Sequence, residues 1–221
     1  MSASPYRVFI VDDHPILREA LATLIGAEDD FQVCGESDDA VRAIDQIAQA
    51  KPDLAVIDIT LKDGSGIELI KNVRAILPDL AVLVLSMHDE ALYAERALRA
   101  GARGYVMKRD TTKRLLEAMR RVMEGGVYLS ERYAAELAAR LVHAPAKSQK
   151  SSVESLSDRE LEVFRLLGRG QGAPAVAKAM HLSRKTVNAY CARIKAKIGV
   201  TNMAELLREA VRFEGSQAKS E

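Results

Sequence analysis

Five short apolar runs alternate with amphipathic stretches along residues 8–124, and this alternation restricts the fold more than any other feature of the chain. The runs are rich in Val, Ile and Leu, as strands covered on both faces of a parallel sheet are, and they lie at 8–11, 31–34, 54–57, 81–85 and 104–107. The stretches between them have helical spacing and lie at 15–26, 39–49, 65–76, 90–100 and 111–124. The alternation predicts an α/β doubly wound five-stranded parallel sheet.

The rest of the chain is predicted to be helical. The residues expected to begin helices there are Ser157 with Glu160 as a capping box, Pro174, Ser183, and Thr201 or Asn202. The residues expected to end helices are Gly168 with Gly170, and Gly199. Helix, short helix, tight turn and basic helix is the order of an all-α helix-turn-helix domain. We therefore expect an α/β domain at 1–128, a connecting helix (130–142) and exposed linker within 129–155, the helix-turn-helix domain at 156–213, and a flexible tail at 214–221.

Charge is divided unequally, although the net charge is only +1. Residues 1–128 contain 16 Lys and Arg against 21 Asp and Glu, whereas residues 129–221 contain 16 against 10. A basic half suits a polyanionic partner. No apolar run approaches the ~20 residues that cross a bilayer, and the N-terminus lacks a signal-peptide pattern. A cytoplasmic protein is expected, with Cys34 and Cys191 as reduced core residues.

Asp58 ends a buried apolar run, and taken alone it is most simply a helix cap or a turn residue. The other strand ends change this interpretation, because the carboxyl ends of parallel strands meet at one edge of a sheet. The residues at those ends are Asp12, Asp13, Ser86 and Lys108. Crowded carboxylates need a cation, and three acids with carbonyl oxygens suit Mg²⁺. A metal-neutralised carboxylate beside a lysine can attack phosphorus and form an aspartyl phosphate.

With these positions in place, residues 6–128 resemble a response-regulator receiver domain, which has a flavodoxin-like fold. Residues 156–213 resemble the helix-turn-helix output domain of the NarL/FixJ (LuxR-type) family. The motifs that carry the resemblance are VDDHP (11–15), IDITLKDGSG (57–66), VLVLSMHDE (82–90), AGARGYVMK (100–108), LSDRELEVFRLL (156–167) and LSRKTVNAYCARIKAKIGV (182–200). Each motif alone is weak, but five receiver positions in order, followed by that output module, form a strong signal.

The resemblance implies that Asp58 is the phosphoacceptor. It also implies that Asp13, Asp58 and the backbone carbonyl of Thr60 bind Mg²⁺, and that Asp12 holds a metal-bound water. Asp12 and Asp13 could in addition cap the following helix. Three departures from the family pattern remove no chemistry: Lys62 and Arg109 stand where Pro is common, and Ser86 replaces the commoner Thr.

The resemblance also implies a switch. Lys108 would pair with a phosphoryl oxygen, Ser86 would donate a hydrogen bond to another, and Tyr105 would then turn inward. Taken alone, Lys108 would be a solvated lysine, Ser86 a turn serine and Tyr105 a core aromatic residue. His14 and His88 lie near the site in sequence, but an oxygen site for Mg²⁺ needs no imidazole, so both are interpreted as structural or exposed.

The third helix of the output domain has an apolar and a basic face. Its predicted buried stripe consists of Val187, Cys191, Ile194 and Ile198. A basic face is by itself most simply solvated, but this one follows a helix and a turn, in a segment (156–213) with 11 Lys and Arg against 5 Asp and Glu. The predicted DNA-contacting residues are Arg184, Lys185, Thr186, Asn188, Ala189, Ala192, Arg193 and Lys195. Tyr190 stands where His is common in the family.

These features predict a phosphorylation-switched bacterial transcription factor and not a dedicated enzyme. A sensor histidine kinase would phosphorylate Asp58, and the third helix would bind double-stranded promoter DNA; RNA polymerase is a further candidate partner. The last helix has an apolar stripe that consists of Met203, Leu206, Leu207, Ala210 and Val211. The outer part of this stripe would form the contact of a homodimer when the chain is phosphorylated. Two alternatives are an output domain that binds a protein instead of DNA, and a hydrolase that uses Asp58, for which no insertion is long enough to build a pocket.

Overall fold

The computed structural model describes residues 4–61, 64–110, 112–143, 152–180 and 182–217. The chain divides into two compact units, Met1–His143 and Ala144–Glu221, and each is considered by itself. Lys62 and most of the predicted linker lie outside the described residues. Among the residues that are described, no helix combines the length and the apolar character needed to cross a membrane.

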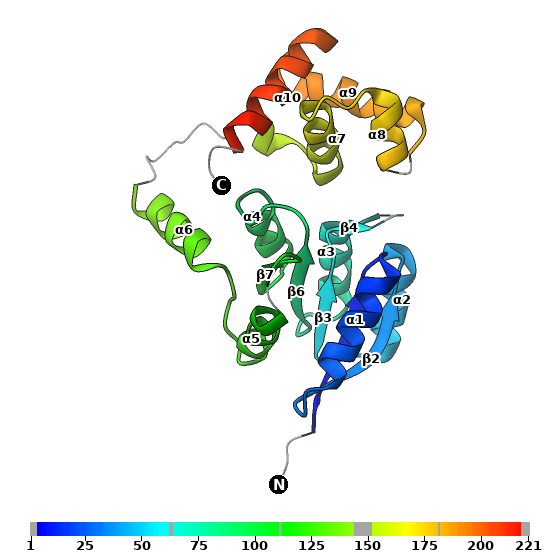
Figure 1. The fold of residues 1–221 in the computed structure, drawn as a ribbon, viewed down its shortest axis with the longest axis vertical. Helices are drawn as coiled ribbons and strands as arrows, with labels where there is room; N and C mark the ends of the chain where they lie inside the picture. Colours follow the sequence, from blue (N-terminus) through cyan, green and yellow to red (C-terminus); the bar gives the residue numbers. More distant parts are fainter. Residues whose placement is uncertain (1–3, 62–63, 111, 144–151, 181, 218–221) are drawn as a thin grey trace. The chain divides into compact units, whose positions relative to one another are not determined.

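The first unit is built on a five-stranded sheet in which all strands are parallel, which confirms the predicted fold class (Figure 1). The strand order is β2-β1-β3-β6-β7. Chain order reverses between β1 and β3, and a doubly wound sheet binds its ligands beside such a reversal. The strands are β1 Tyr6–Val11, β2 Phe31–Ser37, β3 Leu54–Ile57, β6 Ala81–Ser86 and β7 Gly104–Met107.

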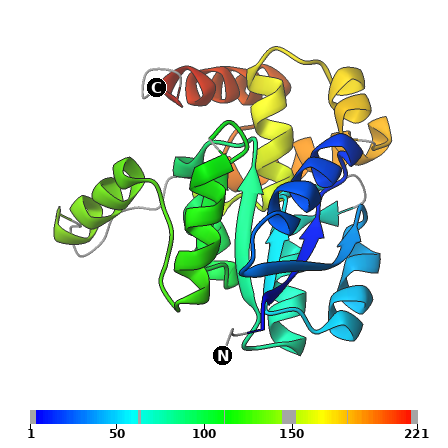
Figure 2. The same ribbon diagram turned by 60° about the horizontal axis from the view of Figure 1, so that its bottom comes forward.

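Five helices cover the two faces of this sheet (Figures 1 and 2). Helices α1 (Pro15–Gly26) and α5 (Thr112–Met123) pack on one face, where their apolar side chains join those of the strands in one core. On the other face α2 (Ala40–Ala50) contacts α3 (Gly66–Ile76), which contacts α4 (Glu90–Ala100). The side chains that α1 and α5 bury in the core are Leu21, Ile25, Leu115, Ala118, Met119 and Val122.

Local chemistry accounts for small differences between the predicted and observed elements. Helix α2 begins at Ala40 because Asp39 is its N-cap and accepts a 2.8 Å hydrogen bond from the backbone N–H of Arg42. A two-stranded hairpin of β4 (Thr60–Leu61) and β5 (Gly64–Ser65) is too short for a periodic signal. Helix α6 covers Glu131–His143, and a 3₁₀ helix, Ser152–Ser155, lies in the predicted linker.

The second unit contains α7 (Asp158–Gly168), α8 (Ala173–Ala179), α9 (Arg184–Ile198) and α10 (Met203–Gln217). The capping box of Ser157 and Glu160 is present. Ser183 caps α9 by accepting a hydrogen bond from Thr186, and Asn202, not Thr201, caps α10 by accepting one from Glu205. Gly199 ends α9 with φ of 76°, a left-handed conformation that glycine adopts without strain. The helix order is the one that the start and stop signals predict.

The prediction of a flexible tail from residue 214 is wrong for residues 214–217, which continue α10. Glu214 holds this last turn in place, because its carboxylate binds Arg165 Nε at 2.7 Å and Arg169 Nε at 3.0 Å. Arg165 is only 9% exposed, so this ion pair joins α10 to the buried side of α7. The rings of Phe164 and Phe213, whose centroids lie 5.7 Å apart, pack in the same interface.

Replacing Glu214 with Ala is expected to lower the free energy of unfolding of the second unit by about 3 kcal/mol, because the buried guanidinium of Arg165 loses the carboxylate that it binds at 2.7 Å. Hydrogen exchange of peptides from α7 and α10 in the full chain measures this loss. Glu209→Ala is the matched control on α10: Glu209 pairs with Arg212 on the surface, where an ion pair contributes less than about 1 kcal/mol. Equal losses for the two variants would contradict the assignment.

The same contact makes the second unit sensitive to acid. Burial raises the pKa of Glu214, but the hydrogen bonds from Arg165 and Arg169 outweigh it and hold that pKa below its ordinary value. The stabilisation is therefore present at neutral pH and is lost as pH falls below about 4.5 and through the folded pKa. The difference between the wild-type chain and Glu214→Ala should shrink over that range, as urea unfolding followed by circular dichroism would show.

Candidate functional site

Three buried side chains from three strand ends meet at the carboxyl edge of the sheet. Lys108 follows β7, and its Nζ lies 2.6 Å from Asp58 Oδ2 and 2.8 Å from Asp12 Oδ2. All three side chains are 3% exposed or less. The strand order brings them together, because β1 and β3 are neighbours and only β6 separates β3 from β7. The predicted convergence of these residues is therefore present in the structure.

Burial and charge act against each other at this contact. Burial raises the pKa of the Asp58 carboxyl to about 6, and the Lys108 ammonium opposes the rise. Burial also lowers the pKa of Lys108, but Asp58 and Asp12 outweigh it, so the net pKa is raised. Lys108 therefore stays charged, and Asp58 is mainly a carboxylate at neutral pH. A carboxylate held in this way can serve as a nucleophile.

Asp13 and His14 extend this cluster toward solvent. Ligand atoms of Asp12, Asp13, His14 and Asp58 all lie within 4.8 Å of one another. The Oδ1 atom of Asp13 is buried and has no hydrogen-bond partner among the described residues, although Nδ1 of His14 lies 2.8 Å from it. Three carboxylates around an unsatisfied oxygen fit a hard divalent cation.

Asp12 and Asp13 do not cap α1, so that alternative is wrong. The N-cap is His14, which makes no side-chain cap hydrogen bond. Asp12 Oδ1 instead accepts a 2.9 Å hydrogen bond from the backbone N–H of His14. Pro15 begins the helix, and because Pro has no N–H, this end of the helix has one donor fewer to satisfy. Both acids are thereby left to face the cluster.

The loop after Asp58 is held by backbone contacts. Asp58 Oδ1 accepts a 3.3 Å hydrogen bond from the N–H of Thr60, and the N–H of Gly66 donates to the carbonyl of Ile59 at 2.8 Å. A Cβ at position 66 would overlap the carbonyl oxygen of Asp58. Glycine at this position therefore lets α3 begin directly against the loop that carries the acid.

Tyr105 already points inward in this structure. Its side chain is 1% exposed, and its hydroxyl donates a 2.9 Å hydrogen bond to the carbonyl of His88. Ser86 is fully buried, and its Oγ accepts a hydrogen bond from the N–H of His88 at 3.3 Å. Tyr105 therefore lies inward in the structure without a phosphoryl group, and its predicted movement on phosphorylation stays a prediction. The His88 carbonyl satisfies the buried hydroxyl without any added group.

His88 contacts two elements beside this site. Its Nε2 lies 2.5 Å from Thr60 Oγ1, and its ring stacks on Tyr93 with centroids 4.7 Å apart. The imidazole thus joins the loop after β3 to the first turn of α4, which is a structural role of the kind that the sequence predicts. Its place two residues after the strand-end Ser86 is the one signal that could have indicated this contact.

Helix α9 exposes a basic face, as its pattern predicts. Val187, Cys191 and Ile194 are buried, whereas Ile198 is half-buried. The predicted DNA-contacting residues lie on the other face; Thr186 and Lys195 are half-buried, and the exposed ones are Arg184, Lys185, Asn188, Ala189, Ala192 and Arg193. The Arg193 guanidinium lies 4.7 Å from the centroid of the Tyr190 ring, in a cation–π contact.

The C-terminal end of α9 is held by an ion pair. Lys197 Nζ lies 2.6 Å from Oε2 of Glu160, whose side chain is 3% exposed. Glu160 also completes the capping box with Ser157 at the start of α7. Burial raises the pKa of Glu160, but Lys197 and Ser157 together hold it below its ordinary value. One buried carboxylate therefore fixes the last turn of α9 against α7.

Two family models match this chain. Residues 8–120 match the response regulator receiver domain, and residues 154–210 match the luxR family of bacterial regulatory proteins. The DNA-binding transcriptional activator DevR/DosR of Mycobacterium tuberculosis is 38% identical over 88% of this chain and 88% of its own length. The transcriptional activator protein ExaE of Pseudomonas putida is 33% identical over 92% and 95%.

A solved structure supports the same relationship over most of the chain. RcsB of Salmonella enterica serovar Typhimurium, bound to promoter P1flhDC in the presence of the phosphomimetic BeF3−, is 25% identical, with 93% of this chain and 98% of that chain covered and a TM-score of 0.60. The chain is a response regulator of the NarL/FixJ family. This confirms the resemblance on which the sequence-based roles rest.

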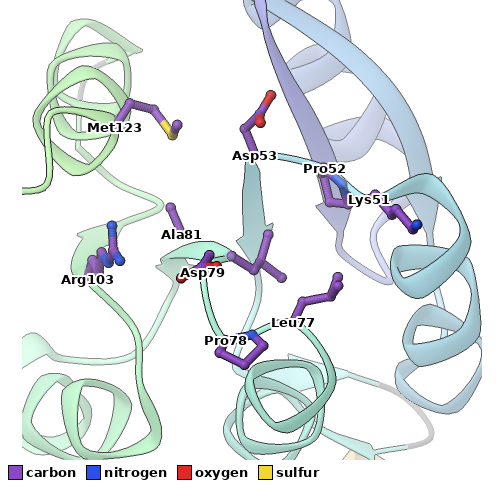
Figure 3. Close-up of a pocket in the computed structure, with 10 residues that line it drawn as sticks. Lys51, Pro52, Asp53, Leu77, Pro78, Asp79, Ala81, Arg103 and Met123 are labelled. Atoms are coloured by element: carbon purple, nitrogen blue, oxygen red, sulfur yellow. The ribbon is translucent and has the colours of Figure 1, made fainter.

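The response regulator also has a hollow of about 300 Å³ at the opposite edge of its receiver sheet (Figure 3). It lies at the amino ends of β3, β6 and β7, where doubly wound sheets do not bind their ligands. Its acids and bases are spread around the rim, unlike the clustered groups at Asp58. The residues that line it are Lys51, Pro52, Asp53, Leu77, Pro78, Asp79, Leu80, Ala81, Arg103 and Met123.

Neutralising Asp58 is expected to stabilise the response regulator at neutral pH when divalent cations are removed with EDTA. The folded pKa, about 6, lies above the ordinary value of 3.8, so ionising this carboxyl opposes folding above pH 6 and not below pH 4. Asp58→Asn should raise the free energy of unfolding by about 1 to 2 kcal/mol at pH 7.5, after allowance for the partner that Lys108 loses, and by almost nothing at pH 4.

Urea unfolding at the two pH values measures the difference. Asp79→Asn changes an exposed acid and is the control, which should show no such dependence on pH. A destabilised Asp58→Asn at pH 7.5 would show that the contact with Lys108 outweighs burial.

Proposed function

We propose that a sensor histidine kinase phosphorylates Asp58, and that the phosphorylated chain binds promoter DNA through α9 and regulates transcription. The observation that carries the proposal is the buried contact of Lys108 with both Asp58 and Asp12 at the strand ends. We assign the receiver to 1–128, the connection to 129–155 and the DNA-binding domain to 156–217, since α10 continues beyond residue 213.

In the proposed reaction an Oδ atom of Asp58 attacks phosphorus. An O–P bond forms, and the bond between phosphorus and the histidine nitrogen of the kinase breaks. Lys108 then shifts from carboxylate to phosphoryl oxygen and offsets the added charge. Asp12, Asp13, Asp58 and the carbonyl of Thr60 would hold Mg²⁺, which supplies further charge neutralisation when bound.

The signal would reach the rest of the receiver through Ser86. Its hydroxyl, now bonded to the N–H of His88, would donate to a phosphoryl oxygen. Because Tyr105 is already inward, phosphorylation would stabilise an existing arrangement of the loop from Ser86 to α4 rather than create it.

In the output domain the exposed cations of α9 would neutralise DNA phosphates, and Asn188 could pair with an adenine edge. Among the described residues, none of the cations Arg184, Lys185, Arg193 and Lys195 forms an ion pair, and this favours DNA over a protein partner. Met203 and Val211 on α10 are 38% and 54% exposed, and they are the proposed contact of a homodimer that reads inverted half-sites.

Genomic fragments bound by the full chain should show an inverted-repeat motif only with beryllofluoride and Mg²⁺, which mimic the phosphoryl group on Asp58. Selection and sequencing with and without the additive measures this. Asp58→Asn should lose both the response and labelling by acetyl phosphate, whereas Asp79→Asn should keep both. Labelling of Asp58→Asn would refute the phosphoacceptor, and equal enrichment without the additive would show that phosphorylation does not control DNA binding.

Arg193 is expected to contact DNA from a position that Tyr190 fixes. Arg193→Ala should weaken binding and reduce the slope of affinity against salt by about one ion. Tyr190→Leu should weaken binding about 2- to 5-fold with an unchanged slope, because the cation remains but its ring contact is lost. Fluorescence anisotropy over a salt series measures both. Lys113→Ala, which removes an exposed receiver cation, is the control; an unaltered slope in Arg193→Ala would place Arg193 away from DNA.

A further inference from the structure

The segment that leads from α5 to α6 (Figure 1) lies alongside the strand that carries Tyr105. The N–H of Tyr105 donates to the carbonyl of Tyr128 at 2.9 Å, and the N–H of Tyr128 donates to the carbonyl of Arg103 at 3.0 Å. Since β7 is the edge strand, this segment pairs with backbone groups that the sheet leaves open. The chain that leaves the receiver is thus attached to the predicted switch strand.

Two residues later the same segment is attached to α4. The N–H of Ser130 donates a 2.8 Å hydrogen bond to Oε1 of Glu90, the first residue of α4. Glu90 is only 5% exposed. Ser130 also begins α6, because its Oγ and its carbonyl accept hydrogen bonds from the N–H groups of Tyr133 and Ala134. Tyr133, 1% exposed, anchors the first turn of α6 in the receiver.

Glu90 is also close in the chain to the proposed phosphorylation site. Two residues before it, His88 donates its N–H to Ser86 and accepts the hydroxyl of Tyr105. Asp89 between them caps α4 by accepting a hydrogen bond from Ala91. The segment 88–90 therefore contacts the switch residues at one end and the start of α6 at the other.

We propose that Glu90 is a positioning residue that couples the phosphorylation site to helix α6. A shift of the loop after Ser86 moves the first turn of α4 and, with it, the Glu90 carboxylate. Because a buried carboxylate is strongly disfavoured without a hydrogen-bond donor, Ser130 follows that carboxylate. The start of α6, and the chain that continues from it to the second unit, move as a result. This inference rests on the proposed function, since it needs Asp58 to receive the phosphoryl group.

Hydrogen exchange of the full chain, with and without beryllofluoride and Mg²⁺, tests the coupling in residues 127–139. ¹⁹F NMR of bound beryllofluoride independently reports occupation of Asp58. In the wild-type chain the additive should change exchange in this segment several-fold. Glu90→Ala should bind beryllofluoride as before, exchange about 10-fold faster in the segment because one buried hydrogen bond is lost, and show no further change with the additive.

Glu95→Ala, which removes a half-buried acid that pairs with Arg99 on the same helix, is the matched control and should respond like the wild-type chain. Ser130→Pro removes the donor from the other side without changing α4, and should also abolish the response. Ser130→Ala keeps the N–H and should retain the response, which separates the contact with Glu90 from the cap of α6. If Glu90→Ala does not fold, the comparison of Ser130→Pro with Ser130→Ala still tests the coupling.

A full response in Glu90→Ala or Ser130→Pro would overturn the coupling. So would a wild-type segment that is unchanged although beryllofluoride is bound, because Glu90 would then hold α6 in place without passing on a signal. Absence of bound beryllofluoride in the wild-type chain would instead overturn the phosphoacceptor assignment, and this inference with it.

Discussion

The receiver's proposed chemistry depends on the contact of Lys108 with two buried carboxylates, those of Asp58 and Asp12. Asp58 and Asp12 carry two negative charges in a site that excludes water, and they repel each other there. Lys108 offsets one of these two charges, and burial, more than the repulsion from Asp12, raises the pKa of Asp58. The site therefore has an excess of negative charge before any phosphoryl group arrives. This excess is why a divalent cation suits it, and the buried, unsatisfied oxygen of Asp13 lies beside it.

The fold and the convergence of the site could be predicted because they depend on short-range patterns and one topological rule. Pro15 and Gly26 bound α1 where the sequence places it, and buried apolar runs identify all five strands. Parallel strands then bring Asp12, Asp58 and Lys108 to one edge whatever the detailed packing. The last turn of α10 could not be predicted in this way. Its partner for Glu214, Arg165, lies 49 residues earlier, and no local pattern reports such an ion pair.

The orientation of Tyr105 also could not be predicted from the sequence. Whether Tyr105 points inward depends on the direction of one backbone carbonyl, that of His88. That direction is set by the loop between β6 and α4, where the His88 ring contacts Thr60 and Tyr93. The sequence identifies which residues lie in this loop but not its conformation, because several weak contacts from three elements determine it together.

In the second unit, one cation of the basic helix α9 holds the helix in place, and another is exposed for contact with DNA. Lys197, near the C-terminal end of α9, is neutralised by the buried carboxylate of Glu160, so it fixes the helix and adds little to an interaction with DNA. Arg193 stacks on Tyr190 while its guanidinium stays on the exposed face. A cation held by a ring loses less conformational freedom on binding than a free one does. The contact of Tyr190 with Arg193 is therefore expected to set how this cation meets DNA.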